Sequence, residues 1–416
     1  MKRARGLLGL MLVYAMVAVV VLWPGVFTGW DSVPGGVRTD IWNGLWSLDF
    51  GRSALLTGAA PWTVDVLAFP AGGNLPPIDP LALLFFLPAG LLGTAVAYQL
   101  LIVARLAVGG VIAHRFAEEF CRAHGVKAAQ AKTAAWIAGL TYASAPVLIA
   151  GVHNGTSEAA NGCGLLFSVW MGWRFGRDPT RRNAKGMVFG LVWAALTSWY
   201  VAVLAFAHAG FVALFHARSQ IFLRRWLPGV VGFLCVLPWV FTVVMLLQVG
   251  DANLSAHGFE IGGEAAGLPP VHFLLNNFGA ADWSAWFGAS ASRDIAILAP
   301  FEAGQGFFHT THIAWIVVIF AAIGIRRVWR KEFALVALAL LSFVFSFGME
   351  THIGGLDVPM PYGFLARMPG FSQLSLSYRY GLGVLPVAVV FAALGAQNQS
   401  RKGIGLLCAA VLLQLR

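Results

Sequence analysis

The carboxylates best placed to do chemistry cluster early in the chain. Asp31, Asp40, Asp49, Asp65 and Asp79 fall in the stretch of residues 30–80, after the first long apolar run. A carboxylate can act as a general base that removes the proton of an attacking hydroxyl. Two of these carboxylates could also bind a divalent metal, although no spacing among them demands one. This stretch is therefore the first candidate for an active face.

One part of this stretch has the spacing of a helix. Between residues 39 and 50, Asp40 and Ser47 share one face, and Trp42 and Trp46 share an adjoining one. Polar residues beside tryptophans predict an amphipathic helix that lies on a membrane surface. Asp40 is our first candidate for the general base, and the alternative is that its carboxylate caps the helix.

Three further aspartates are placed differently. Asp31 follows the first apolar run directly and is the main rival to Asp40, or else it is an ordinary interfacial carboxylate. Asp49 and Asp79 are weaker candidates for the base, because Asp79 precedes Pro80 and can simply shape that turn. We count both among the candidate substrate-binding residues.

Two arginines, one histidine and one glutamate complete the set of candidate residues. Arg379 lies at the mouth of an apolar run, where it could bind a lipid phosphate or act as a snorkelling interface anchor. His153 and Glu158 flank a tight turn between apolar runs, which needs polar residues with or without chemistry. Arg105 lies inside a run, where a charge is costly and faces protein or water. It forms a structural ion pair, snorkels toward the interface, or contacts a phosphate or pyrophosphate deep in a cavity.

The histidines and cysteines do not form a metal signature. His309 and His312 are three residues apart and lack a third ligand. The four cysteines show no metal-binding spacing and offer no extracytoplasmic disulfide. We therefore name no certain cofactor and leave a divalent metal open.

The composition fixes the class of protein that must position these residues. The chain has 416 residues, of which 58% are hydrophobic and 11% charged. Soluble domains average about 25% charged residues, so this surface faces lipid rather than water. The net charge of +10 does not indicate nucleic acid, because the cations stand in short clusters between apolar runs. The sequence predicts an all-α membrane protein.

The apolar runs predict a polytopic bundle of about 10–11 spans, since a bilayer core needs roughly 20 apolar residues per helix. The first run, residues 7–27, is too long for a signal peptide and predicts an uncleaved span. Further spans fall near residues 94–114, 133–151, 158–173, 187–198, 199–217, 227–248, 312–325, 333–348 and 380–396. The pair that meets near residue 198 is one bent hairpin or two thin spans. From residue 404 the chain is either truncated or ends in a half-helix.

The loops predict the orientation. With the N-terminus in the cytoplasm, 21 of the 28 Lys and Arg residues fall on the cytoplasmic side, as the positive-inside rule requires. In contrast, 14 of the 18 Asp and Glu residues fall outside. A single transmembrane domain, residues 1–416, thus presents three long outer loops at 30–80, 250–311 and 349–379. We expect these loops to carry short helices.

Several different short motifs follow one another along the chain in a particular order. An early outer Asp and a tryptophan-bearing helix lead to a proline-rich approach and a short apolar segment, residues 76–88. The later motifs are Ala97-Tyr98-Gln99, Tyr142-Ala143-Ser144-Ala145-Pro146, Gly151-Val152-His153-Asn154, Pro369-Gly370-Phe371 and Arg379-Tyr380. This order resembles bacterial membrane glycosyltransferases of the GT-C superfamily, in the branch of the YfhO-type and RgtA-like multi-span proteins. Those proteins commonly have Ala-Tyr-Asn at the first of these motifs, and an apolar or small residue in place of Arg105.

The resemblance implies a reaction and its partners. A sugar would pass from a polyprenyl-phosphate donor to an extracytoplasmic glycan, lipid or protein acceptor at the outer face of the cytoplasmic membrane. An outer aspartate, Asp40 or Asp31, would act as general base, and a nearby Arg or His would stabilise the departing phosphate. Membrane lipid is the other expected partner, and no nucleic acid is expected.

Two other functions stay open at this point. A transporter or a lipid or glycan flippase would use ionisable residues or broken helices near the membrane midplane, and Arg105 is such a charge. A glycan polymerase or ligase would use Arg379 and His153 rather than an aspartate.

Overall fold

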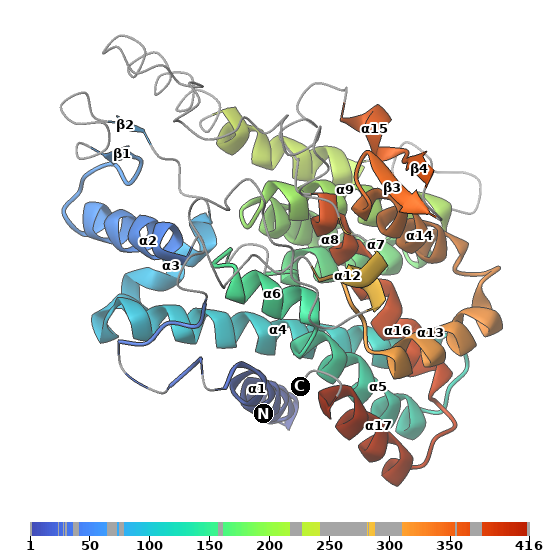
Figure 1. The fold of residues 1–416 in the computed structure, drawn as a ribbon. Coiled ribbons are helices and arrows are strands. Elements are labelled where there is room, and N and C mark those ends of the chain that lie inside the picture. The colour runs from blue at the N-terminus through green and yellow to red at the C-terminus, as the bar shows by residue number, and fades with distance from the viewer. Residues whose placement is uncertain are drawn as a thin grey trace.

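The computed structural model describes the helical framework and parts of the loops (Figure 1). The described residues are 2–23, 25–27, 29, 31–35, 41–64, 73–74, 79–156, 161–216, 227–241, 281, 283–287, 310–353, 356–366 and 377–413. These residues form a bundle of α-helices with two small two-stranded sheets. The prediction of an all-α membrane bundle is confirmed.

Within the described residues, four helical stretches are long and apolar enough to cross a membrane. They are Arg5–Leu22, Thr94–Ala123, Ala128–His153 and Ser377–Gly395. Shorter apolar helices stand at Pro80–Leu92, Trp199–Phe215, Leu227–Phe241 and Phe333–Ser346. Three of these shorter helices fall where the sequence predicted further spans, and Pro80–Leu92 falls on the apolar segment judged too short to cross. The protein is therefore an integral membrane protein.

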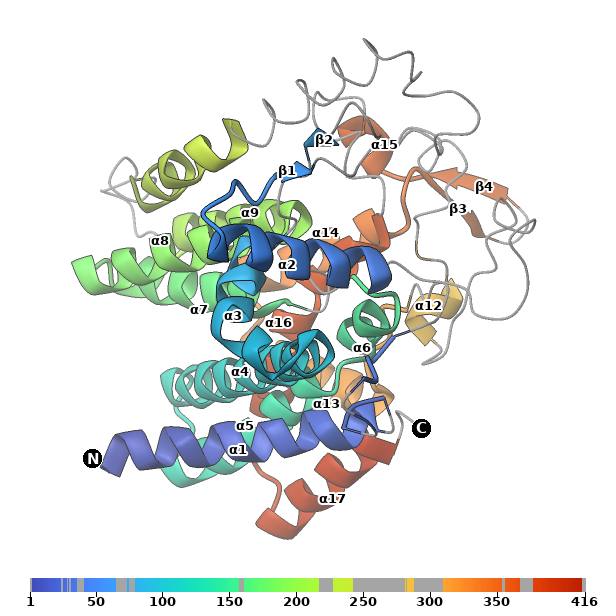
Figure 2. The ribbon, with the colours of Figure 1, turned by 90° about the vertical axis from the view of Figure 1, so that its left-hand side faces the viewer.

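The central element is α4 (Thr94–Ala123), which is buried along most of its length. It packs against α1 (Lys2–Leu22) and α5 (Ala128–Ala143), with α17 (Arg401–Leu413) on the far side of α5. Figure 2 shows α1, α5 and α17 together below α4.

Prolines and polar residues break the apolar runs into separate helices. Pro146 occupies the first turn of α6 (Pro146–His153), where its fixed φ and missing N–H are tolerated, so the run that began with α5 bends here. Near residue 198 the chain forms two helices, with Ser198 in extended geometry at the N-cap of the second. Of the two expectations for this pair, the structure shows two short helices. They are α8 (Arg181–Ala195) and α9 (Trp199–Phe215), and both pack against α7 (Cys163–Arg177).

The C-terminal helices cross very closely. The helix α13 (Trp315–Val328) packs against α16 (Leu385–Gly395), and α14 (Phe333–Ser346) lies beside both α9 and α16. At the crossing, a Cβ on Gly324 would lie 2.1 Å from the Phe391 carbonyl oxygen, and one on Gly395 would lie 1.9 Å from that of Phe320. Only glycine on both helices lets the two backbones come this close.

The three long loops that the sequence predicts on the outer side, called the outer loops below, contain short helices. The helix α2 (Ile41–Leu56) confirms the helical spacing, and its buried face packs against α3 (Pro80–Ala89) and α4. A 3-10 turn, Gly90–Leu92, connects α3 to α4. Other short helices in these loops are α12 (Trp283–Phe287) and α15 (Tyr362–Leu365), and the 3-10 helix η4 (Ser377–Gly383) begins the last candidate span.

Two antiparallel hairpins in these loops were not predicted. The first pairs β1 (Thr63–Val64) with β2 (Gly73–Asn74). The second pairs β3 (Glu350–Ile353) with β4 (Leu356–Pro359). Strands of two to four residues are too short for a clear alternation of apolar and polar residues, which explains why the sequence did not reveal them.

Candidate functional site

Side chains of α4 hold three acid-bearing segments of the first outer loop. Thr94 Oγ1 donates a hydrogen bond of 2.7 Å to Asp49 Oδ1 on α2. Three turns further along the same face, the Arg105 guanidinium pairs with Asp79 at the start of α3. Gln99, between them, holds the segment that follows α1. The outer half of α4 therefore sets where the carboxylates of this loop lie.

Gln99 fixes the backbone on both sides of Asp31. Its side chain is buried, and its Oε1 accepts a hydrogen bond of 2.8 Å from the Phe27 N–H. Its Nε2 donates to the Ser32 carbonyl oxygen at 2.5 Å and to that of Gly29 at 3.3 Å. Asp31 lies between these two carbonyls and is itself exposed. The candidate site is therefore the exposed carboxylate of Asp31, on a backbone segment that the buried amide of Gln99 holds in place.

The same segment contains a backbone conformation that is rare for its residue type. Phe27 has a φ of 58°, in the left-handed region that residues other than Gly, Asn and Asp seldom adopt. Its N–H is the one that Gln99 accepts. Such strained residues persist where the surrounding structure holds them, and they concentrate at functional sites.

Asp79 and Arg105 form a buried ion pair. Asp79 Oδ1 accepts a hydrogen bond of 2.9 Å from the Ala82 N–H and so caps α3, while Oδ2 contacts Arg105. The two side chains are 3% and 7% exposed. Of the three roles expected for Arg105, the structure shows the ion pair. The expectation that Asp79 shapes the turn before Pro80 agrees with its role as a helix cap.

Several predicted residues lie outside the described part of the chain. These are Asp40, Glu158 and Asp65, together with His309 of the His309–His312 pair. His153 ends α6, and the turn after it lies against α2, where a Cβ on Gly44 would be 3.4 Å from the Gly155 carbonyl oxygen. The His153 turn is therefore brought next to the helix that follows Asp40.

Arg379 lies in an aromatic cluster on η4. Its side chain is buried, and its guanidinium carbon is 4.9 Å from the centroid of the Tyr200 ring, a cation–π distance. The Tyr380 ring lies 5.2 Å from that of Tyr362 and 6.4 Å from that of Tyr200. At 7% exposure, Arg379 is not an anchor that extends into water. The structure gives it a buried, aromatic setting in which an anion would interact strongly.

An apolar pocket adjoins the segment that carries Arg379. Its volume is about 360 Å³, and it lies between α12, α13, α14 and the start of α16, which follows η4 directly. Its walls include Trp286, Trp315, Phe343 and Val387. The sequence could not reveal this pocket, because its walls come from four separate segments of the chain.

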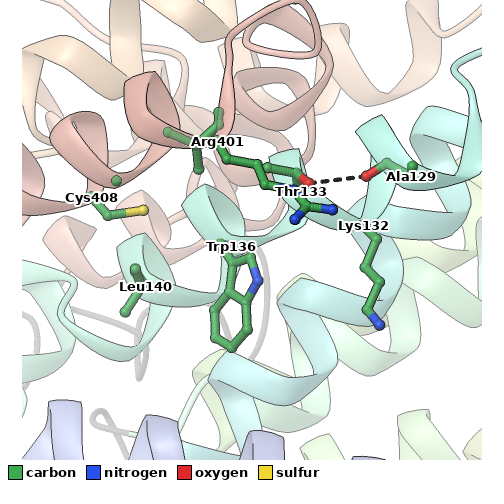
Figure 3. Close-up of a pocket in the computed structure, with 9 residues that line it drawn as sticks. Ala129, Lys132, Thr133, Trp136, Leu140, Arg401 and Cys408 are labelled. Atoms are coloured by element: carbon green, nitrogen blue, oxygen red, sulfur yellow. Dashed lines mark hydrogen bonds between the residues drawn. The ribbon is translucent and has the colours of Figure 1, made fainter.

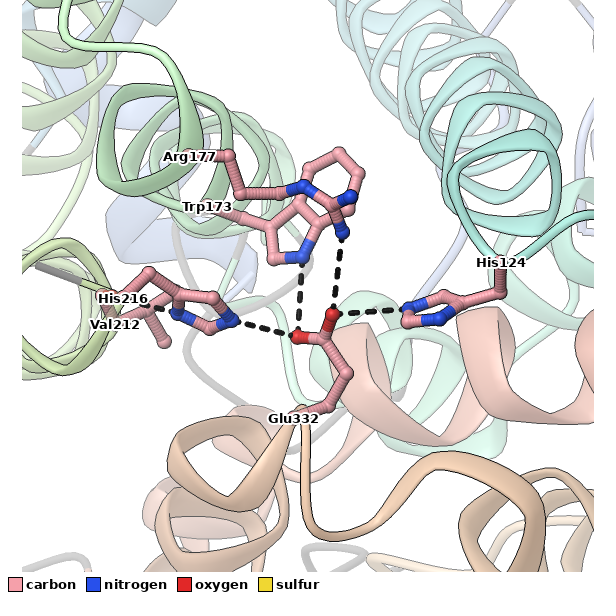
Figure 4. Close-up of polar contacts among 6 residues, drawn as sticks. All are labelled: His124, Trp173, Arg177, Val212, His216 and Glu332. Carbon is pink, nitrogen blue, oxygen red and sulfur yellow. Dashed lines mark hydrogen bonds and ion pairs between the residues drawn. The ribbon is translucent and has the colours of Figure 1, made fainter. Parts of the chain in front are cut away.

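A second polar cluster, at the opposite ends of the helices, centres on Glu332 between α13 and α14 (Figure 4). One carboxylate oxygen contacts His124 Nε2 at 2.9 Å and Arg177 at 3.5 Å. The other contacts His216 Nε2 at 2.9 Å and accepts a hydrogen bond of 3.1 Å from the Trp173 indole N–H. We call these five residues the Glu332 cluster. It joins α4, α7 and α9 to the turn between α13 and α14 at one buried acid.

The Glu332 cluster changes the acidity of its members. Burial raises the pKa of Glu332, but the hydrogen bonds from His124 and His216 and their charge outweigh this and lower it to about 2. Burial lowers the pKa of His216, and the hydrogen bond and charge of Glu332 more than offset it, so the pKa is raised. Sequence reasoning missed this cluster, because its members are up to 208 residues apart.

The described residues contain no group of three or more His, Cys, Asp and Glu side chains that could hold a metal ion. Of the aspartates in the first outer loop, Asp49 and Asp79 are bound to Thr94 and Arg105. These residues do not form a metal site with Asp31, and a divalent metal stays a prediction.

Comparison with known proteins identifies the fold. Neither a protein-family model nor a curated protein sequence matches the chain. Among solved structures, the chain is similar to the archaeal oligosaccharyltransferase AglB from Archaeoglobus fulgidus, in complex with an inhibitory peptide and a dolichol-phosphate. The TM-score is 0.50 at 16% identity, over 94% of this chain and 50% of that one.

The oligosaccharyltransferase from the same organism in its apo form is also similar, with a TM-score of 0.42 at 15% identity and the same coverage. The chain thus spans about half the length of these proteins. What the chain shares with AglB is the fold of this helical membrane region.

Proposed function

We propose that this protein is a membrane glycosyltransferase that transfers a sugar from a polyprenyl-phosphate donor to an extracytoplasmic acceptor. The observation that carries the proposal is the exposed Asp31, held by Gln99 after the first span of a fold shared with AglB. AglB was solved with a dolichol-phosphate and a peptide, which supports a lipid-linked donor here. The acceptor is a glycan, a lipid or a protein.

In this proposal Asp31 is the general base. Its carboxylate takes the proton of an acceptor hydroxyl as the oxygen attacks the anomeric carbon of the sugar. The bond between that carbon and the phosphate oxygen breaks, and the lipid phosphate leaves with the bonding electrons. A cation stabilises the charge on the departing phosphate, and Arg379 is our candidate for this role. The adjoining apolar pocket fits part of a polyprenyl chain, since its walls are aromatic and aliphatic.

Asp40 is the alternative base, and a transfer assay separates the two. Membranes that contain the full chain are incubated with labelled polyprenyl-phosphate sugars, and Asp31→Asn, Asp40→Asn and Asp49→Asn are compared with wild type. Loss of a general base lowers transfer by about 10²- to 10⁴-fold. We expect that loss for Asp31→Asn, and near wild-type transfer for Asp49→Asn, whose parent carboxylate is bound to Thr94.

Other outcomes contradict parts of the proposal in different ways. Loss of transfer in Asp40→Asn alone would assign the base to Asp40. If wild type transfers no sugar to any acceptor pool, the glycosyltransferase proposal fails. Transport of a lipid-linked sugar in proteoliposomes, unchanged by any of the three substitutions, would favour a flippase. Activity that survives in all three variants but is lost on changing Arg379 or His153 would favour a polymerase or ligase.

A further inference from the structure

A pocket of about 510 Å³ lies between α5 and α17 (Figure 3). It is remote from Asp31 in the chain, and the proposed reaction does not use it. Its lining residues are Ala129, Lys132, Thr133, Trp136, Leu140, Arg401, Ile404, Gly405 and Cys408. On each helix these residues follow the three- and four-residue spacing of a single face. The pocket is therefore a groove that runs along two neighbouring helices.

The groove is polar at one end and apolar along the rest. Arg401 is the first residue of α17 and Lys132 is the fifth residue of α5, so both cations lie toward the end where these helices begin. Trp136 and Leu140 lie one and two turns further along α5, and Cys408 two turns further along α17. By the predicted orientation, the cationic end meets the cytoplasmic surface and the apolar part enters the bilayer. A groove with this gradient matches an amphipathic ligand.

The cationic end is not neutralised by the described part of the protein. Lys132 and Arg401 form no ion pair with described residues, whereas Arg122 and Arg174, on neighbouring helices, pair with Glu118 and Glu119. No lining residue of the groove is acidic. The N-termini of α5 and α17 add partial positive charge at the same end. All these features favour an anionic group between the two helices.

We propose that this groove binds an anionic phospholipid, with its phosphate between Lys132 and Arg401 and one acyl chain along Trp136 and Leu140. A lipid is favoured over a free phosphate, because a free anion would use only the cationic end and leave the apolar part empty. Basic pockets between membrane helices on the cytoplasmic side are a recognised setting for anionic head groups. The inference does not depend on the proposed glycosyl transfer.

Binding to the purified full chain in detergent tests this proposal. Native mass spectrometry measures binding of short-chain phosphatidylglycerol, phosphatidylcholine of the same chain length, and glycerol phosphate, which is the head group alone. The double variant Lys132→Gln/Arg401→Gln removes both cations of the groove. Its matched control, Lys127→Gln/Lys402→Gln, removes two cations at the same end that do not line the groove. We expect phosphatidylglycerol affinity to fall roughly tenfold or more in the first variant and to change little in the control.

A second variant tests the apolar part. A Cβ on Gly405 would meet no atom within 4 Å, so Gly405→Leu should fold and place its side chain in the groove. We expect it to weaken phosphatidylglycerol binding while both cations remain. Three results would overturn the proposal: equal binding of phosphatidylcholine, equal losses in the two double variants, or glycerol phosphate binding as tightly as the lipid in wild type and Gly405→Leu alike.

Discussion

The two ends of the helical bundle use their carboxylates in opposite ways. At the end expected to be cytoplasmic, the glutamates that α4 carries pair with arginines. Glu118 contacts Arg115 at 3.1 Å and Arg122 at 2.5 Å, and Glu119 contacts Arg174 at 2.8 Å. At the same end, Glu332 is surrounded by four donors from three helices, α4, α7 and α9.

The opposite end, expected to be the outer one, places its carboxylates without neutralising all of them. Asp49 accepts a hydrogen bond from a neutral threonine, and Asp31 stays exposed on a backbone that Gln99 anchors. Asp79, paired with Arg105, is the outer acid that resembles the cytoplasmic ones. The comparison separates acids that hold helices together from an acid that is held in place and left available. Substitutions at the first kind should change stability, and substitutions at the second kind should change activity.

The largest expected effect on stability is at Glu332. Glu332→Gln keeps the shape of the side chain but leaves His124, His216, Trp173 and Arg177 facing an amide instead of a carboxylate. Breaking a buried, charged cluster of this kind costs about 3–5 kcal/mol. We expect a large fall in the thermal unfolding temperature in detergent, with the transfer rate per folded molecule unchanged.

The matched control is Glu119→Gln, since the Glu119–Arg174 pair is about one third exposed on both sides. An exposed pair is worth at most about 1 kcal/mol, so the unfolding temperature should move little. Equal losses of stability in the two variants would remove the distinction between a buried cluster and a surface pair.

The next effect, on activity, is at Gln99. Gln99→Leu removes the amide that fixes the backbone around Asp31, and a misplacement of about 1 Å can cost about 10²-fold in rate. Gln99→Glu keeps the oxygen that accepts from Phe27 but loses the donor to Ser32, so it should fall between Gln99→Leu and wild type. The measurement is the transfer rate per folded molecule. A loss of folded protein with no change in that rate would make Gln99 a purely structural residue.

A smaller effect is expected at Thr94. Thr94→Val removes the hydroxyl that donates to Asp49, which is itself only partly buried, and one hydrogen bond of this kind is worth about 1 kcal/mol. We expect a small fall in unfolding temperature and wild-type transfer. A large loss of transfer would instead show that Asp49, not Asp31, is the carboxylate that the outer end presents.

The smallest effect is a dependence of stability on pH through His216. Its pKa is raised in the folded protein, so the stabilisation is complete below the ordinary value of 6.5 and is lost as the pH rises through the raised value. The charged groups that face it are Glu332 and Arg177. Unfolding temperatures measured from about pH 6 to about pH 9 should decline in wild type and less so in His216→Gln.

At acid pH, the dependence of the unfolding temperature on pH is due to Glu332. Its pKa is lowered from 4.5 to about 2, so its contribution is present at neutral pH and is lost as the pH falls through that interval. If the unfolding temperatures of wild type and His216→Gln depend on pH in the same way above neutral pH, the claim that His216 is protonated in the folded protein is wrong.

The sequence predicted the positions of the apolar helices well, because lipid-facing segments must be continuous and apolar. The boundary near Ser198 was also predicted, whereas the predicted span 133–151 runs across Pro146, where the structure begins a new helix. In contrast, the ion pair of Asp79 with Arg105 depends on how α3 folds back on α4. The motif Ala97-Tyr98-Gln99 was visible, but its contact with the segment around Asp31 required the packing of α1 on α4. The Glu332 cluster could not be predicted from the sequence, because its members come together only when the whole bundle is folded.

The crossing of α13 and α16 has a consequence for the apolar pocket. Both helices form its walls, and Gly324 and Gly395 set how near their axes can come. A methyl group at either glycine would push the helices apart, because the atoms it meets are backbone carbonyls that cannot rotate away. These two glycines therefore set the width of the pocket. The thickness of the polyprenyl chain that we propose it binds is limited by two residues that the polyprenyl chain would not contact.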